Sequence, residues 1–181
     1  RNQERLGLGW AQLRWMFSSA PAGPYTPLTW MTLGLDHLVW GMDPRGYHLT
    51  SVLIHCADSA LFYFTAAALL RRAAAPGEAA DAEPAALFAA LLFSLHPLRV
   101  ESVSWLSGRH DPLCTLFFLA AMLAYLRAPS GRSPLFFFVL SLLSKASALV
   151  LPPVLLLLDV YPLRRLPADP RRWSAPDTAP R

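Results

Sequence analysis

The chain has 181 residues, 54% of them hydrophobic and only 15% charged, with a mean hydropathy of +0.34. Soluble domains carry about 25% charged residues, so this composition argues against an ordinary soluble domain and favours a membrane protein. The net charge of +4 does not indicate a nucleic-acid partner, because the Arg residues stand in short clusters between apolar segments and not along one face. The two cysteines, Cys56 and Cys114, exclude a disulfide framework, and we expect both to be small buried residues of helices.

Residues 1–46 are predicted to form an outer-face segment with two interfacial amphipathic helices, over Leu6 to Phe17 and Leu28 to Val39. Both helices are too short to span a bilayer, which takes about 20 apolar residues. Trp side chains prefer the headgroup level of a membrane, so we interpret those of this segment as membrane anchors and not as sugar-binding surfaces. They are Trp10, Trp15, Trp30 and Trp40.

Residues 47–165 are predicted to form a transmembrane bundle of about five spans, which makes the fold all-α and polytopic. The first span covers Tyr47 to Leu70. An apolar helix over Ala85 to Leu95 ends before Pro97, and Val100 to Leu126 is predicted to be one continuous helix.

The stretch from Pro134 to Tyr161 carries Lys145 near its middle. It fits either one kinked helix or a hairpin of two short helices that turns near Ser144 to Ala148. We favour the hairpin, because it places the Arg residues that follow the stretch on the same side of the membrane as the earlier Arg clusters.

The Arg clusters at 71–72, 127–132 and 164–172 predict the topology, since cytoplasmic loops are enriched in Lys and Arg. Residues 1–46, 96–111 and the turn at Lys145 then face the other side. We expect a bacterial inner membrane, with this second side in the periplasm. The Pro- and Arg-rich residues 166–181 are expected to be a cytoplasmic tail. Because the chain starts without Met or an apolar leader, we expect it to be a piece of a longer membrane protein.

The stretch from His96 to Asp111 is the candidate site. It holds two His, two Arg, one Glu and one Asp between two strongly apolar runs. Charged groups in the middle of a membrane helix cost about 2.5–3.5 kcal/mol each. A polar cluster at the mouth of two spans therefore indicates either a functional site or a salt-bridge network that seals the helix ends.

Four blocks of the sequence, in this order, carry a family resemblance. They are PYTPLTW at 24–30, GYHLTSVLIH at 46–55, HPLRVESVSW at 96–105 and LLLLDVYPLRR at 155–165. The series resembles the membrane part of bacterial TPR-associated glycosyltransferase-like proteins and of the transmembrane and TPR-containing O-mannosyltransferases of animals, within the GT-C superfamily. The resemblance implies inverting transfer of a sugar, with mannose as the candidate, from a polyprenyl-phosphate donor to a hydroxyl of a protein or glycan acceptor.

This sequence departs from the family pattern at three points. The Asp pair that the family carries in its first outer loop, its expected catalytic acid, does not occur here, and neither does the TPR array. Lys145 is followed by Ala146, where relatives often have an acidic residue or Pro.

Under the resemblance, Glu101 and His96 are the candidate catalytic residues. Glu101 would accept the proton of the acceptor hydroxyl as a general base, and His96 would be a further donor or a metal ligand. Cationic groups are needed for the leaving phosphate, and on one helix Glu101, Trp105 and Arg109 would share a face. The candidate substrate-binding residues are Arg109, Arg99, Trp105, Lys145 and His48.

Each of these assignments has a structural alternative. Lys145 is either a phosphate-binding charge or a snorkelling side chain, and His48 is open between donor binding and structure. For His55 and Asp58, which follow His48 on the first span, we favour hydrogen bonds to neighbouring helices. Asp159 is predicted to pair with Arg residues at a cytoplasmic helix end.

The predicted partners are a lipid-linked sugar donor, a protein or glycan acceptor and membrane lipids. No His, Cys or carboxylate spacing defines a metal site, although the superfamily resemblance admits a divalent metal ion. Two other functions stay open. One is a non-catalytic membrane anchor or assembly module of a TPR protein, which the missing Asp pair favours. The other is a transporter segment, which is disfavoured because the polar groups gather on one side.

Overall fold

The computed structural model of the chain describes residues 7–18, 25–75 and 79–167, and within these residues every regular element is a helix. The all-α prediction is therefore confirmed, while most of the predicted tail lies outside the described residues. The α-helices are α1 (Trp10–Ser18), α2 (Pro27–Trp40), α3 (Pro44–Ala73), α4 (Ala82–Leu95), α5 (Leu98–Ser104), α6 (His110–Arg127), α7 (Arg132–Ser144) and α8 (Leu151–Val160). Short 3₁₀ helices are η2 (Ala79–Asp81), η3 (Leu106–Arg109) and η4 (Ala146–Val150).

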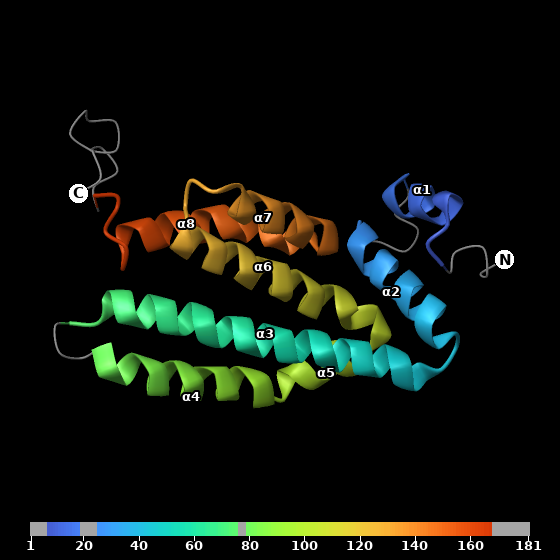
Figure 1. Cartoon of the computed structure of the whole chain (residues 1–181), viewed down its shortest axis with the longest axis horizontal. Coiled ribbons are helices and arrows are strands. Elements are labelled where there is room, and N and C mark those ends of the chain that lie inside the picture. Colours follow the sequence, from blue (N-terminus) through green and yellow to red (C-terminus); the bar gives the residue numbers. More distant parts are fainter. Residues whose placement is uncertain (1–6, 19–24, 76–78, 168–181) are drawn as a thin grey trace.

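The helices form two groups that meet along α3 and α6 (Figure 1). In one group α4 runs back along α3 and continues into α5. In the other α6 packs against α7, and α8 returns beside them. Both predicted N-terminal helices are present, and α2 meets α3 at the end of the bundle where α5 also lies.

The turn from α2 to α3 depends on two glycines. Gly41 has φ +60°, a backbone conformation that favours glycine. At Gly46 a Cβ atom would lie 2.1 Å from Cγ of Trp40, so a side chain there would displace the indole. Helix α3 then begins at Pro44, where the missing N–H costs nothing, and the Asp43 carboxylate caps it by accepting from the Arg45 N–H at 3.0 Å.

The predicted hairpin within 134–161 is confirmed. Helix α7 ends at Ser144, Lys145 lies in the turn, and α8 runs back toward the end of α6 (Figure 1). Leu151 of α8 packs with Ala121 and Met122 of α6 in the buried core cluster. Near the other end of α8, the Tyr125 hydroxyl donates to Asp159 at 2.5 Å, and Arg165 pairs with the same carboxylate at 3.3 Å.

The prediction of one continuous helix from Val100 to Leu126 is wrong. Helix α5 ends at Ser104, η3 follows, and α6 begins only at His110. Pro112 explains the break, because its ring would clash with the carbonyl of Gly108 in a continuous helix and therefore has to lie in a first turn. Glu101, Trp105 and Arg109 consequently do not share one helical face.

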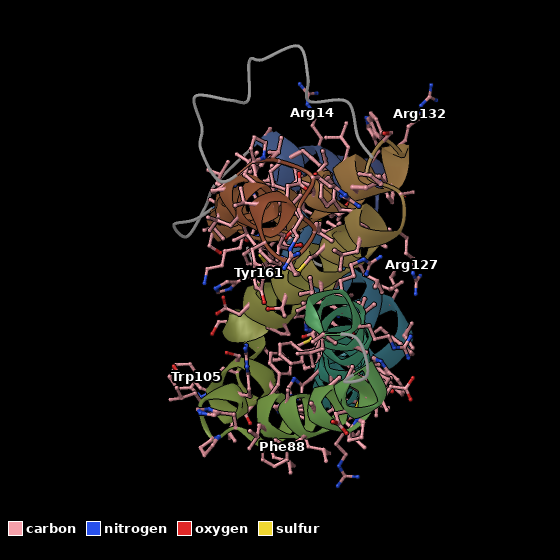
Figure 2. All side chains as sticks on the ribbon, turned by 90° about the vertical axis from the view of Figure 1, so that its left-hand side faces the viewer. Arg14, Phe88, Trp105, Arg127, Arg132 and Tyr161 are labelled. Atoms are coloured by element: carbon pink, nitrogen blue, oxygen red, sulfur yellow. The ribbon has the colours of Figure 1, made fainter. Side chains whose placement is uncertain are left out.

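The number of spans is not confirmed. Among the described helices, α3 alone is long and apolar enough to cross a membrane, and α4 with α5 makes a second span only if the pair, bent by 60°, counts as one. Helix α7 has 13 residues, roughly 20 Å at the rise of an α-helix, against a hydrocarbon core of about 30 Å. Large apolar side chains nevertheless cover the outside of α4, and Figure 2 shows Phe88 pointing away from the bundle.

The two cysteines differ. Cys114 is buried, as predicted, and its sulfur lies 3.4 Å from Oγ of Ser141 across the α6–α7 contact. Cys56 is exposed, so the expectation that it is buried is wrong. It lies on the side of α3 that also carries exposed apolar side chains and that neighbouring helices do not cover.

Candidate functional site

A cavity of about 580 Å³ lies between the first half of α2 and the segment from α5 to the start of α6. Its volume falls within the range of about 300–1,000 Å³ that is typical of ligand pockets. Its walls mix hydroxyl, carboxylate and aromatic side chains. The lining residues are Thr26, Thr29, Trp30, Leu33, Glu101, Ser102, Trp105, Leu106, Ser107, Gly108, His110 and Asp111.

The two carboxylates of the cavity differ in their partners. Asp111 forms an ion pair with Lys145 from the α7–α8 turn, and Nε2 of His110 lies 3.5 Å from the same carboxylate. Glu101 is exposed, and no ion pair or side-chain hydrogen bond engages it within the described residues. Because Lys145 engages Asp111 while no described side chain engages Glu101, Glu101 is the candidate that can contact a substrate hydroxyl directly.

Two predicted substrate-binding residues also lie at or beside this cavity. Trp105 forms part of its rim with 63% of its surface exposed, and Figure 2 shows the indole pointing outward. Lys145 stands behind Asp111, so its charge is already paired where the cavity begins.

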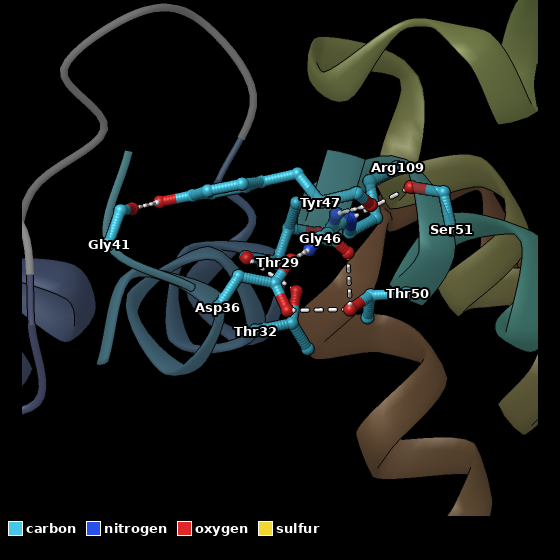
Figure 3. A network of polar contacts seen from close by, with 9 residues as sticks. All are labelled: Thr29, Thr32, Asp36, Gly41, Gly46, Tyr47, Thr50, Ser51 and Arg109. Carbon is cyan, nitrogen blue, oxygen red and sulfur yellow. Dashed lines mark hydrogen bonds and ion pairs between the residues drawn. The ribbon is translucent and has the colours of Figure 1, made fainter. Parts of the chain in front are cut away.

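Arg109 does not reach the cavity. Its side chain is fully buried and forms an ion pair with Asp36 of α2 (Figure 3). Its Nε donates to Oγ of Ser51 at 3.2 Å, and Nη2 donates to the Tyr47 carbonyl at 2.6 Å. The remaining acceptor oxygen of Asp36 receives the Thr50 hydroxyl at 2.7 Å. With these donors engaged, the expectation that Arg109 binds a phosphate in the cavity is not supported by its position.

This network determines the shape of the cavity instead. In the sequence, Asp36 comes after the residues of α2 that line one wall of the cavity. Arg109 comes directly after Gly108, which lines the opposite wall. A buried ion pair is retained at low cost only if hydrogen bonds satisfy both partners, which is the case here. The pair therefore holds α2 against η3 and the first turns of α3.

His96 and Arg99 lie away from Glu101. They line two other pockets, on the side of α5 that faces α3 and α4, and neither residue lines the cavity. Nδ1 of His96 accepts the Leu98 N–H at 3.3 Å, and the Arg99 guanidinium stacks 4.2 Å from the centre of the Phe93 ring. The two predicted catalytic residues, Glu101 and His96, are thus not brought into one cavity.

The polar residues of α3 have mostly structural contacts. Nε2 of His55 lies 3.1 Å from the Ser94 carbonyl, and its ring stacks on Phe93 with centroids 6.0 Å apart. Asp58 is buried at 1% exposure, but its Oδ1 has no hydrogen-bond partner within the described residues, so the hydrogen bond expected between Asp58 and a neighbouring helix is not found there. His48 is exposed and lines none of the pockets described above.

Sequence reasoning missed Asp36 and assigned no role to Asp111. Asp36 is the one acidic residue of the mostly apolar helix α2, and this is a signal, since a charge in such a setting usually has a buried partner. For Asp111 the signal in the sequence is the following Pro112, because a proline marks the start of a helix at the edge of the polar cluster. Trp30 was assigned to the membrane interface, but it lines the cavity and packs edge-on against Trp15 with centroids 5.5 Å apart.

No group of three or more His, Cys, Asp or Glu side chains in the part of the chain that the structure describes could hold a metal ion. Asp111 already has Lys145 as its partner, and His96 points to another pocket than Glu101. The residues present therefore do not fit the divalent ion that the superfamily resemblance admits.

The chain is similar in sequence to several curated proteins. It is 35% identical over 114 residues to Protein O-mannosyl-transferase Tmtc3 of Drosophila melanogaster. The aligned region covers 58% of this chain and 12% of that protein. It is 37% identical over 108 residues to Protein O-mannosyl-transferase TMTC4 of Homo sapiens, covering 58% of this chain and 15% of that protein. Over 108 residues it is also 37% identical to Protein O-mannosyl-transferase tmtc2 of Xenopus laevis, covering 60% of this chain and 12% of that protein.

The chain therefore spans about one eighth of the length of these relatives. No family model matches the chain, and no solved structure matches it.

Proposed function

This chain is homologous to a segment of the TMTC protein O-mannosyltransferases, and from this homology we propose that it forms part of a membrane glycosyltransferase that transfers mannose. The donor is a polyprenyl-phosphate mannose and the acceptor a hydroxyl group of a protein. The structural observation that carries the proposal is the cavity beside α5, because it presents the Glu101 carboxylate, unpaired among the described residues, within a sequence block of the family resemblance. The GT-C assignment and the polytopic bundle belong to the same proposal.

In the proposed reaction Glu101 takes the proton of the acceptor hydroxyl. The acceptor oxygen forms a bond to the anomeric carbon, while the bond from that carbon to the phosphate oxygen breaks. The electron pair of the broken bond leaves with the polyprenyl phosphate. Trp105 offers an apolar face to the sugar or the isoprenyl chain, while Lys145 stays behind the cavity wall in its ion pair with Asp111.

We place the cavity on the non-cytoplasmic side of the membrane. The Arg clusters gather at the opposite end of the bundle, where Arg72 donates to the Leu126 carbonyl at 2.9 Å and Arg71 pairs with Glu83. Clustered Arg residues favour the cytoplasmic side. The relatives named above come from animals, so the non-cytoplasmic side of an organelle membrane is as suitable as a periplasm.

The proposed function is tested by mannosyl transfer in membranes that contain the full-length protein. The assay supplies polyprenyl-phosphate mannose with a labelled sugar and a Ser- or Thr-containing peptide. We expect donor-dependent labelling of the peptide hydroxyl. A correctly inserted protein that transfers no sugar would favour the anchor alternative, and donor-independent movement of a small solute through it would favour the transporter alternative.

Substitution of Trp105 by Ala should raise the KM for the donor roughly 2- to 10-fold, as expected for the loss of one aromatic contact at a cavity rim. The kcat should change less, since Trp105 does not take part in the proton transfer. Steady-state kinetics with varied donor measures both constants. Trp10→Ala is the matched control, because Trp10 is 82% exposed and lies outside the cavity. Equal effects of the two substitutions would contradict the role of Trp105.

The proposed orientation predicts different labelling of two engineered cysteines at exposed turns. Ser107→Cys, in the cavity lining, should react with a membrane-impermeant maleimide in sealed vesicles whose non-cytoplasmic face points outward. Ser130→Cys, in the turn before α7, should react only after the membrane is permeabilised. Labelling of Ser130→Cys alone in sealed vesicles would reverse the topology.

A further inference from the structure

A groove lies on the other side of α5 from the cavity. It consists of two adjoining pockets of about 560 and 310 Å³ that share His96 and Arg99. We call these two pockets the α3–α5 groove. At 3.6 residues per turn, Arg99 and Val103 of the groove each point about 160° away from Glu101 of the cavity. The two hollows are therefore separated by the body of α5.

The polar end of the groove offers hydrogen-bond donors. The Arg99 guanidinium lies over the Phe93 ring, and within the described residues no ion pair or hydrogen bond uses its N–H groups. Because Nδ1 of His96 accepts the Leu98 N–H, the neutral ring carries its proton on Nε2, which is a further donor. A planar guanidinium fork matches the geometry of a phosphate group.

Apart from His55, Ser94 and Ser104, the rest of the groove is apolar, and the buried carboxylate of Asp58, which interacts electrostatically with Arg99, lies outside its lining. Phe62 of α3 and Phe93 of α4 form its floor and stack with centroids 4.7 Å apart. Leu92 and Leu98 form its edge and are 56% and 77% exposed, and the neighbouring Leu95 is 78% exposed. No Asp or Glu lines either pocket. The groove thus joins a row of exposed apolar side chains to one cationic end.

We propose that the α3–α5 groove binds an anionic glycerophospholipid. The phosphate group lies against Arg99 and His96, and an acyl chain lies along the apolar side of α4. This lipid is not the sugar donor, because a phosphate at Arg99 lies on the opposite side of α5 from Glu101 and cannot share the cavity with it. The inference does not depend on the proposed transferase activity.

The test is lipid titration of the detergent-solubilised full-length protein, followed by native mass spectrometry. Phosphatidylglycerol and phosphatidylcholine with identical acyl chains are the probes, and polyprenyl phosphate is added in a third titration. We expect the wild-type protein to retain phosphatidylglycerol more tightly than phosphatidylcholine. Arg99→Gln should weaken phosphatidylglycerol binding roughly tenfold, as the loss of a charge-assisted contact implies. Arg99→Lys should weaken it less, because the charge stays while the fork is lost.

Arg45→Gln is the matched control, since Arg45 is an exposed arginine at the same end of the bundle but lines neither pocket. It should leave phosphatidylglycerol binding unchanged. Equal retention of the two phospholipids, or an equal loss in Arg45→Gln and Arg99→Gln, would overturn the proposal. Binding of polyprenyl phosphate through Arg99 without phosphatidylglycerol binding would assign the groove to the donor instead. Loss of sugar transfer in a variant that still retains phosphatidylglycerol would concern only the transferase proposal.

Discussion

Replacement of Asp36 by Asn should lower the free energy of unfolding by about 3–5 kcal/mol, the cost of leaving one member of a buried ion pair without its partner. The substitution keeps the volume and the acceptor for Thr50, so the change isolates the charge. Arg109 would stay fully buried with an uncompensated positive charge among Ser51 and the Tyr47 carbonyl. Thermal or denaturant unfolding of the full-length protein in detergent micelles measures the difference.

The exposed pair Arg71–Glu83 provides the control. Its two side chains are 54% and 57% exposed, so Glu83→Gln should cost no more than about 0.2–1 kcal/mol. The double variant Asp36→Leu with Arg109→Met should recover much of the loss, because well-packed apolar residues often replace a buried ion pair without penalty. If Asp36→Asn destabilised the protein no more than Glu83→Gln, the buried pair would not hold α2 to the bundle.

Glu101→Gln should reduce kcat for mannosyl transfer about 10²- to 10⁴-fold, which is the usual contribution of a general base. Glutamine keeps the size and the hydrogen-bonding oxygen but cannot accept the acceptor proton at neutral pH. Because Glu101 is exposed and unpaired among the described residues, the substitution should leave folding and membrane insertion unchanged. Single-turnover transfer from polyprenyl-phosphate mannose, with a thermal melt on the same sample, measures both properties.

Two further substitutions make this result specific. Glu83→Gln, at the opposite end of the bundle, should keep full activity. Asp111→Asn removes the other carboxylate of the cavity and frees Lys145. If Asp111→Asn abolished transfer while Glu101→Gln did not, the base would be Asp111, and the assignment of Glu101 would be wrong.

The helices could be predicted from sequence because their signals are local. The end of α4 before Pro97 follows from the chemistry of proline, whereas α3 begins at Pro44, three residues before the predicted start at Tyr47. The hairpin turn at Lys145 follows from the length of the apolar stretch and from the positions of the Arg clusters. The break at η3 was missed although Pro112 gives a local signal for it, since the apolar run after it was joined to α5.

The partners of the charged residues could not be predicted in the same way. Asp36 and Arg109 are 73 positions apart, and no local pattern of the sequence links them. From the sequence, Arg109 was therefore interpreted as a free cation next to Glu101. In the structure its side chain points inward and pairs with Asp36 of α2. Asp111 and Lys145, 34 positions apart, pair for the same reason once α7 folds back on α6.

The amino-acid sequence alone determined the helical class, the placement of apolar segments and Arg clusters, and the likeness to the O-mannosyltransferases, because all of these reside in residue type and short-range order. The tertiary structure decided which side of α5 each polar residue occupies: Glu101 faces the cavity, whereas His96 and Arg99 face the α3–α5 groove. That outcome depends on the rotation of α5 about its axis. Packing of α5 against α3, η3 and α6 sets this rotation, and a helical period by itself leaves it undefined.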